Sequence, residues 1–147
     1  MKCLCLVLSA SLLFFHHDDH KSASGKAELS EVRVEKLAQS ISSWNGDKLP
    51  AYPKGQPEVT ILKITVPPKT KLDMHTHPFI NAGVLLKGEL HVVTADGKKL
   101  TLKEGDSIVE LVGKEHFGEN KSDKPAEIIV FYAGIQGKMV TRKKKSP

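Results

Sequence analysis

The sequence predicts one all-β domain, either a barrel or a sandwich of short strands. At least six short runs of apolar or β-branched residues follow one another from about Val32 onward, with no helical period between them. An Asp-Gly pair separates two of these runs, which is typical of a tight hairpin. The chain has 147 residues, 39% of them hydrophobic, which suits a single domain with a modest core.

The predicted strands follow in chain order. Residues 59–66 are rich in β-branched side chains and end at Pro67-Pro68, where a strand cannot continue. Residues 82–86, 89–94 and 99–103 come next, and Asp96-Gly97 joins the last two as a hairpin. Residues 107–112 and 126–133 supply two further strands. We therefore place the barrel at residues 58–135.

Residues 26–57 are expected to form an N-terminal strand and loop. Val32, Val34 and Leu37 fit either an edge strand or a short helix. Residues 44–57 contain three prolines and two glycines, a composition typical of a loop.

Residues 1–25 have the pattern of a signal peptide. A basic residue, Lys2, precedes a 13-residue apolar run at residues 3–15, shorter than the ~20 residues of a membrane-spanning helix. Small residues at 22–25 offer a cleavage site. We expect an exported protein, periplasmic or secreted, with no membrane span after processing; the alternative is a cytoplasmic protein. The histidine and aspartate cluster at residues 16–20 is expected to be a solvated junction and not a metal site.

The charge pattern argues against a nucleic-acid partner. Lys and Arg number 22 against 17 Asp and Glu, a formal charge of +5, but much of this excess lies at residues 142–145. Aromatic residues, on which bases would stack, make up only 5% of the chain. We expect residues 136–147 to be a solvated basic tail and expect no nucleic-acid partner.

Three histidines stand in a pattern that suggests a metal site. Residues i and i+2 of a strand share a face, so His75 and His77 would present two imidazoles to one cation. Asn81 has the same parity and would add a neutral oxygen nearby. His116 is the third histidine of the globular part with a distinct surrounding pattern.

The spacing around these residues forms two motifs. The first runs His75-Thr76-His77, three residues, Asn81, six residues, Gly88; the second begins 17 positions later and runs Gly105, five residues, Leu111, one residue, Gly113, two residues, His116, three residues, Asn120. This order resembles the two sequence motifs of the cupin superfamily. The resemblance implies a cupin-type double-stranded β-helix, or jelly-roll barrel, with a metal held by His75, His77 and His116. It also implies a homodimer.

The chain departs from the family pattern at three positions. Asn81 stands where the family usually has a glutamate ligand, Lys69 replaces an expected glycine, and Leu111 replaces a proline. Three neutral imidazoles and an amide would leave the double charge of a divalent ion uncompensated. Such a centre would attract an anionic ligand and favour zinc, iron, nickel or copper.

Two further residues are candidates for lining the pocket. Glu110 alternates with Ile108, so it is expected to point inward, where burial would raise its pKa and suit acid or base chemistry. Tyr132 lies within an apolar strand and would either line the pocket or pack.

The sequence leaves three functions open. The first is a metal-binding barrel that takes a small anionic molecule. The second is a metal-dependent enzyme of the dioxygenase, isomerase or lyase class. The third is a metal-free interaction or storage module.

Overall fold

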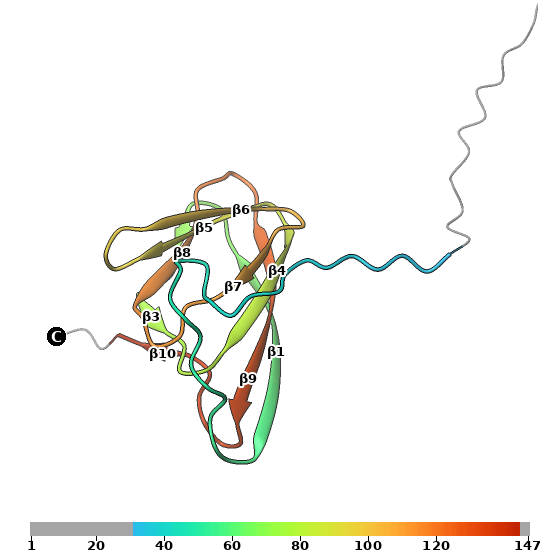
Figure 1. Cartoon of the computed structure of the whole chain (residues 1–147). Coiled ribbons are helices and arrows are strands. Elements are labelled where there is room, and N and C mark those ends of the chain that lie inside the picture. The colour runs from blue at the N-terminus through green and yellow to red at the C-terminus, as the bar shows by residue number, and fades with distance from the viewer. Residues whose placement is uncertain (1–30, 145–147) are drawn as a thin grey trace, which may run out of the picture. The chain divides into compact units, whose positions relative to one another are not determined.

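The computed structural model describes residues 31–144, and from Glu35 onward the chain forms one compact antiparallel β unit (Figure 1). The expected signal peptide at residues 1–25 and the cluster at residues 16–20 lie outside the described residues. Within the described part of the chain, no helix is long and apolar enough to cross a membrane.

Ten strands make up the described fold. In chain order they are β1 (Pro57–Val66), β2 (Thr70–Lys71), β3 (His75–Thr76), β4 (Asn81–Lys87), β5 (Glu89–Thr94), β6 (Lys99–Lys103), β7 (Ser107–Val109), β8 (His116–Asn120), β9 (Ala126–Ile135) and β10 (Arg142–Lys143). The strands expected from the sequence correspond to β1, β4, β5, β6, β7 and β9.

The strands are arranged in two antiparallel sheets. The first has the order β1-β9-β4-β7, and the second has the order β10-β3-β8-β5-β6, with β2 beside β8. Buried apolar side chains of both sheets form one core cluster. The predicted all-β jelly-roll barrel is confirmed, and its sheets enclose the interior between them.

Side-chain alternation determines what faces this interior. Along β8, His116, Gly118 and Asn120 are buried, while the residues between them are partly exposed. Along β4, Asn81 and Leu85 are buried in the same way. Since alternate residues of a strand share one face, a few polar residues of these strands are directed into an otherwise apolar core.

Two tight turns between neighbouring strands depend on glycines with positive φ. Gly88 joins β4 to β5 with φ of 81°, and Gly97 lies in the predicted Asp-Gly hairpin between β5 and β6 with φ of 88°. A Cβ at Gly88 would lie 2.8 Å from the carbonyl oxygen of Pro125, whereas a Cβ at Gly97 would have nothing within 4 Å.

We expect Gly88→Ala to lower the free energy of unfolding by about 2–4 kcal/mol, because it adds a backbone clash to an unfavourable φ. Gly97→Ala carries the φ penalty alone and should cost about 1 kcal/mol. Chemical denaturation of the two variants measures the difference. Equal losses would show that the contact with Pro125 is relieved by a small shift of the backbone.

Lys69 occupies the position where the family pattern has a glycine. Its φ is 53°, and it is the one non-glycine residue with positive φ in the described range. This left-handed conformation costs a residue with a Cβ about 1–2 kcal/mol, which explains why glycine suits the position. Lys69 also pairs with Asp123 at 3.0 Å.

The described residues do not contain the expected N-terminal strand or its alternative, a short helix. No strand or helix precedes β1 from residue 31 to residue 56; a single bridge joins Ser42 and Lys48. Val32 and Val34 are 93% and 89% exposed and lie in neither a strand nor a helix. The expected loop is present, and Trp44 packs against the core.

Candidate metal centre

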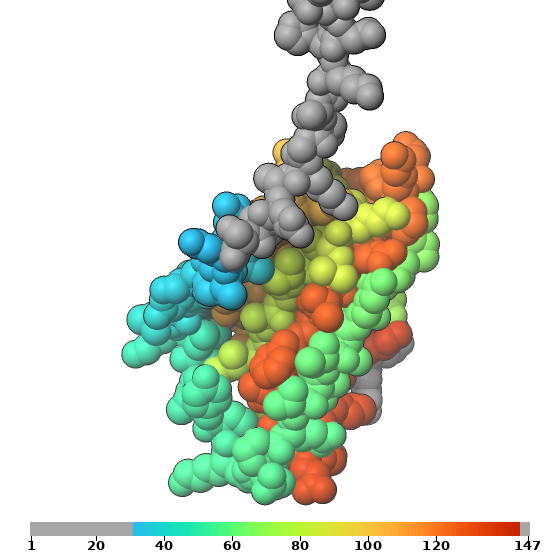
Figure 2. Space-filling view, turned by 90° about the vertical axis from the view of Figure 1, so that its right-hand side faces the viewer, coloured from blue at the N-terminus to red at the C-terminus, as the bar shows by residue number. Residues whose placement is uncertain are grey.

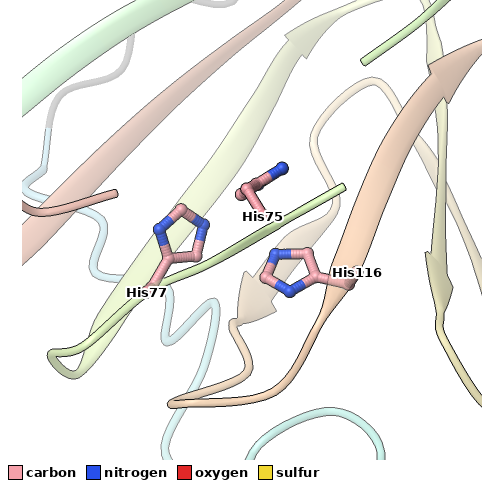
Figure 3. A group of neighbouring side chains, drawn as sticks. All are labelled: His75, His77 and His116. Atoms are coloured by element: carbon pink, nitrogen blue, oxygen red, sulfur yellow. The ribbon is translucent and has the colours of Figure 1, made fainter. Parts of the chain in front are cut away.

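The three predicted histidines converge between the two sheets. In the register of β3 and β8, His75 lies directly opposite His116, and His77 follows β3 by one residue. One ring nitrogen of each histidine lies within 4.8 Å of one nitrogen of each other ring. Figure 3 shows the rings of His77 and His116 facing the side chain of His75. This arrangement brings three nitrogen donors close enough together to hold one metal ion.

Backbone carbonyl groups fix the orientation of all three rings. Their Nδ1 atoms lie 2.7 Å from Asp73 O for His75, 3.1 Å from Val140 O for His77 and 2.9 Å from Lys114 O for His116. A carbonyl oxygen can only accept, so each Nδ1 is the donor and each neutral ring keeps an unprotonated Nε2. Histidines that bind metals commonly donate their other nitrogen in this way.

Burial keeps these rings neutral. It lowers the pKa of His77 from 6.5 to about 4 and also lowers the pKa values of His75 and His116. A metal ion binds the neutral form of imidazole, so these rings are ready to bind near neutral pH without first losing a proton.

The other predicted site residues face the histidines from the opposite sheet. Asn81 of β4 pairs with Tyr132 of β9, and the backbone N–H of Glu110 donates to Asn81 O at 3.0 Å. All three are buried. The rings of Tyr132 and His77 are 5.4 Å apart, edge to face. The structure therefore brings all six predicted site residues into one place.

Two buried atoms of this site have no hydrogen-bond partner among the described residues. Asn81 Oδ1 is one, since only Nδ2 of this amide bonds, to Phe79 O at 3.1 Å. The other is His116 Nε2. Buried polar atoms are rarely left unpaired. Two unpaired lone pairs beside two further imidazoles fit a cation, so the residues present suit a divalent metal ion.

Glu110 lies next to the histidines as an inward-facing carboxyl group. Its Oε2 is 3.5 Å from His116 Nε2 and accepts a hydrogen bond from the N–H of Leu111 at 3.2 Å. Burial raises the pKa of Glu110 to about 7. Burial also raises the pKa of Tyr132, which a hydrogen bond with Thr141 partly offsets.

A cavity of about 260 Å³ lies between the sheets with the histidines at one side. Apolar side chains form most of its wall: Leu62, Ile64, Leu72, Leu90, Val92, Ile128 and Val130. Thr141 and Lys143 also border it. The space is suited to a small molecule with an apolar body and one polar end.

Part of the expected basic C-terminal tail, within residues 136–144, pairs with the barrel although most of its side chains are exposed. Arg142 and Lys143 form β10, which pairs with β3, and the Lys144 N–H donates to Met74 O at 3.0 Å. Val140 O accepts from His77 Nδ1, and Thr141 Oγ1 lies 3.2 Å from the same nitrogen. Paired with β3, the segment leaves its lysine side chains at the surface, where Lys143 contacts Asp73 at 2.9 Å.

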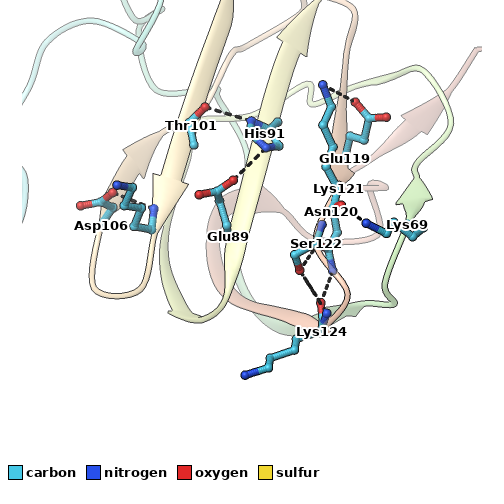
Figure 4. A network of polar contacts seen from close by, with 11 residues as sticks. Lys69, Glu89, His91, Thr101, Asp106, Glu119, Asn120, Lys121, Ser122 and Lys124 are labelled. Atoms are coloured by element: carbon cyan, nitrogen blue, oxygen red, sulfur yellow. Dashed lines mark hydrogen bonds and ion pairs between the residues drawn. The ribbon is translucent and has the colours of Figure 1, made fainter.

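Two other polar residues of the barrel have structural roles (Figure 4). Asn120, the last residue of the second motif, donates to Val66 O and Lys124 O at 3.0 and 2.8 Å, so it ties the end of β1 to the turn before β9. His91 projects from β5 beside Glu89 and Thr101, 3.0 Å from the former. Neither side chain belongs to the metal centre.

A family model described as a cupin domain matches residues 62–132. No curated protein matches the chain.

Solved structures resemble the barrel. The DMSP lyase DddQ of Ruegeria pomeroyi DSS-3 is 19% identical with a TM-score of 0.51, over 58% of this chain and 42% of that one. An oxalate decarboxylase of Lactobacillus farciminis, in a formate complex, is 16% identical with a TM-score of 0.50, over 58% and 26%. An oxalate oxidase with the substrate analogue glycolate is 24% identical with a TM-score of 0.47, over 52% and 42%. This chain spans less than half of each, and such identities show the fold alone.

Proposed function

Because residues 62–132 form a cupin domain, we propose that this protein is a metal-binding barrel that takes a small anionic molecule at a three-histidine centre. The observation that carries the proposal is the common orientation of the histidines. Each Nδ1 bonds to a backbone carbonyl oxygen, which leaves three Nε2 lone pairs for one cation. A bound divalent ion would supply a Lewis acid with coordination positions open to a ligand.

Donor chemistry supports a nitrogen-preferring ion. His75, His77 and His116 would be the protein ligands, with the amide oxygen of Asn81 beside them. Imidazole suits zinc, iron, nickel and copper. We therefore propose one of these four as the native ion.

The expected charge of the centre supports an anionic ligand. Neutral imidazoles leave positive charge on a bound divalent ion, whereas Lys143 at the border of the cavity is already paired with Asp73 at 2.9 Å. The remaining wall is largely apolar. A small carboxylate or similar anion would place its charge at the ion and its apolar part against β1, β5 and β9.

Elemental analysis tests the metal centre. We expect protein purified without chelator or affinity tag to contain close to one transition-metal ion, and the variant with both His75→Ala and His77→Ala to contain none. His91→Gln, which alters a surface histidine of the same barrel, should keep the ion. Residues 16–20 are the same in all three proteins, so metal bound there cancels in the comparison.

The loaded protein can then be titrated calorimetrically with small carboxylates and phosphates, before and after metal removal. Binding that requires the metal supports the proposal. Equal metal contents in wild type and the double variant would reject the centre and favour a metal-free interaction module.

A homodimer is also proposed, on the basis of an apolar outer face. Val59 and Ile61 of β1 are 60% and 59% exposed, and Phe131, opposite Ile61 on β9, is 45% exposed. Figure 2 shows β1 in green and β9 in orange-red side by side on this face. Such a patch fits a second copy of the chain. A sedimentation mass equal to one chain would reject the dimer.

Export remains a prediction from residues 1–25. N-terminal sequencing of the protein recovered outside the cytoplasm would locate the cut, which we expect near residues 22–25. Recovery of the intact chain from the cytoplasm alone would contradict it.

A further inference from the structure

We propose that Glu110 supplies the carboxylate ligand of the metal centre, from the position across the sheet from Asn81. The inference rests on the proposed metal centre and deepens it. It assigns to Glu110 a role that its place in the sequence does not reveal, because Asn81 occupies the position at which the family pattern has its glutamate.

The strand register places Glu110 beside Asn81. Strand β4 pairs with β7 through Ala82 and Val109, and the next residues along, Asn81 and Glu110, remain hydrogen-bonded through Glu110 N and Asn81 O. Both side chains are buried and border the cavity. The barrel therefore carries an amide at the start of β4 and a carboxyl group just after β7, on hydrogen-bonded residues whose side chains both border the cavity.

Distance supports a role at the metal. Glu110 Oε2 lies 3.5 Å from His116 Nε2, and the Glu110 side chain is only 10% exposed. When Glu110 is ionised, its carboxylate oxygen and the unprotonated Nε2 are both electron-pair donors, so they do not stabilise each other directly. A divalent cation bound by both would satisfy both.

Charge balance strengthens the inference. Three imidazoles alone leave the full double charge of the ion inside a low-dielectric barrel, and one carboxylate halves it. The centre would then have three histidines and one glutamate, and it would still carry a single positive charge toward an anionic ligand. A carboxylate also improves binding of oxygen-preferring ions such as manganese more than binding of zinc.

Equilibrium dialysis of Mn²⁺ and Zn²⁺ against purified apoprotein tests this assignment. We expect Glu110→Gln to weaken Mn²⁺ binding by about 100-fold or more and to weaken Zn²⁺ binding less. This loss of Mn²⁺ affinity exceeds the usual effect of removing a residue that only hydrogen-bonds to a metal ligand. Adding Asn81→Glu to Glu110→Gln moves the carboxylate to the neighbouring strand and should recover most of the Mn²⁺ affinity. Glu89→Gln, which removes a surface carboxylate of the same barrel, should change neither affinity.

Wild-type Mn²⁺ affinity in a folded Glu110→Gln variant would overturn the inference and leave Glu110 as a buried carboxyl group that only lies near His116. A double variant no better than Glu110→Gln would overturn the placement across from Asn81. The His75→Ala, His77→Ala protein keeps the two failures apart. If it still binds metal as wild type does, the metal centre itself is wrong; if it alone loses metal, only the role of Glu110 is wrong.

Discussion

Saturation with the native metal ion is expected to raise the midpoint of thermal unfolding by roughly 10–20 °C. An ion present at about 1,000 times its Kd adds about 4 kcal/mol to the stability of the folded state, because the unfolded chain does not hold the three imidazoles together. In a domain of this size each kcal/mol moves the midpoint by several degrees. His116→Gln removes a ligand that is almost fully buried, and the increment should then vanish.

For each protein, the midpoint of thermal unfolding is measured with chelator and then with metal, and the two values are compared. A lower stability of metal-free His116→Gln, caused by altered packing, therefore does not enter the result. His91→Gln should keep the whole increment, since this ring contacts Glu89 and Thr101 and not the centre. An unchanged increment in His116→Gln would place the stabilising ion elsewhere.

Much of the barrel could be predicted because its signals are local. The Asp96-Gly97 turn and the alternating residues around it predict β5 and β6 without any knowledge of the rest of the chain. The His-x-His pair and His116 could be brought together only through the spacing of two motifs, since they are about forty residues apart. The structure places His75 opposite His116 on β3 and β8, with His77 directly after β3.

Long-range backbone contacts could not be predicted in the same way. Val140 contributes a carbonyl oxygen to His77, and every residue has a carbonyl, so no side-chain pattern marks it. Strand β10 has two residues, and their positive charges resemble those of a solvated tail. Similarly, Val32 and Val34 are β-branched, as many strand residues are, but they lie in no strand.

The sequence predicts which residues belong to the candidate site, but it does not predict which of them lie next to each other. Alternation with Ile108 directs Glu110 inward, but a period of two does not say which neighbour it meets. Its position beside Asn81 follows from the pairing of β4 with β7, which depends on the closed barrel. For this reason the sequence suggested a centre without a carboxylate, whereas the fold places one next to His116.

The pH dependence of the metal-free protein should show two opposing effects. Burial lowers the pKa values of all three site histidines, to about 4 for His77, so the unfolded chain binds more protons below pH 6.5 and stability falls with acidification. Burial raises the pKa of Glu110 from 4.5 to about 7, so the folded chain binds its proton more tightly. That contribution is complete below pH 4.5 and is lost as the pH rises through 7.

Glu110→Gln isolates the second effect. The groups facing Glu110, namely His75, His116 and Tyr132, are present in both proteins, so their own titration largely cancels. At pH 4.5 and below, a protonated glutamate and a glutamine are nearly equivalent, and the two proteins should have similar stability. By pH 8 wild type must bury an ionised carboxylate, and the variant should be more stable by about 3 kcal/mol, at about 1.4 kcal/mol per pKa unit.

Chemical denaturation in the presence of a chelator, at several pH values from 4.5 to 8, measures this difference. A difference that stays constant across the range would show that Glu110 ionises as easily in the folded barrel as in the unfolded chain. Metal should reverse the order at pH 8, because an ion bound beside Glu110 turns the cost of its charge into an attraction that glutamine lacks. The same substitution would thus stabilise the empty barrel and weaken the loaded one, an opposition that a purely structural role for Glu110 would not produce.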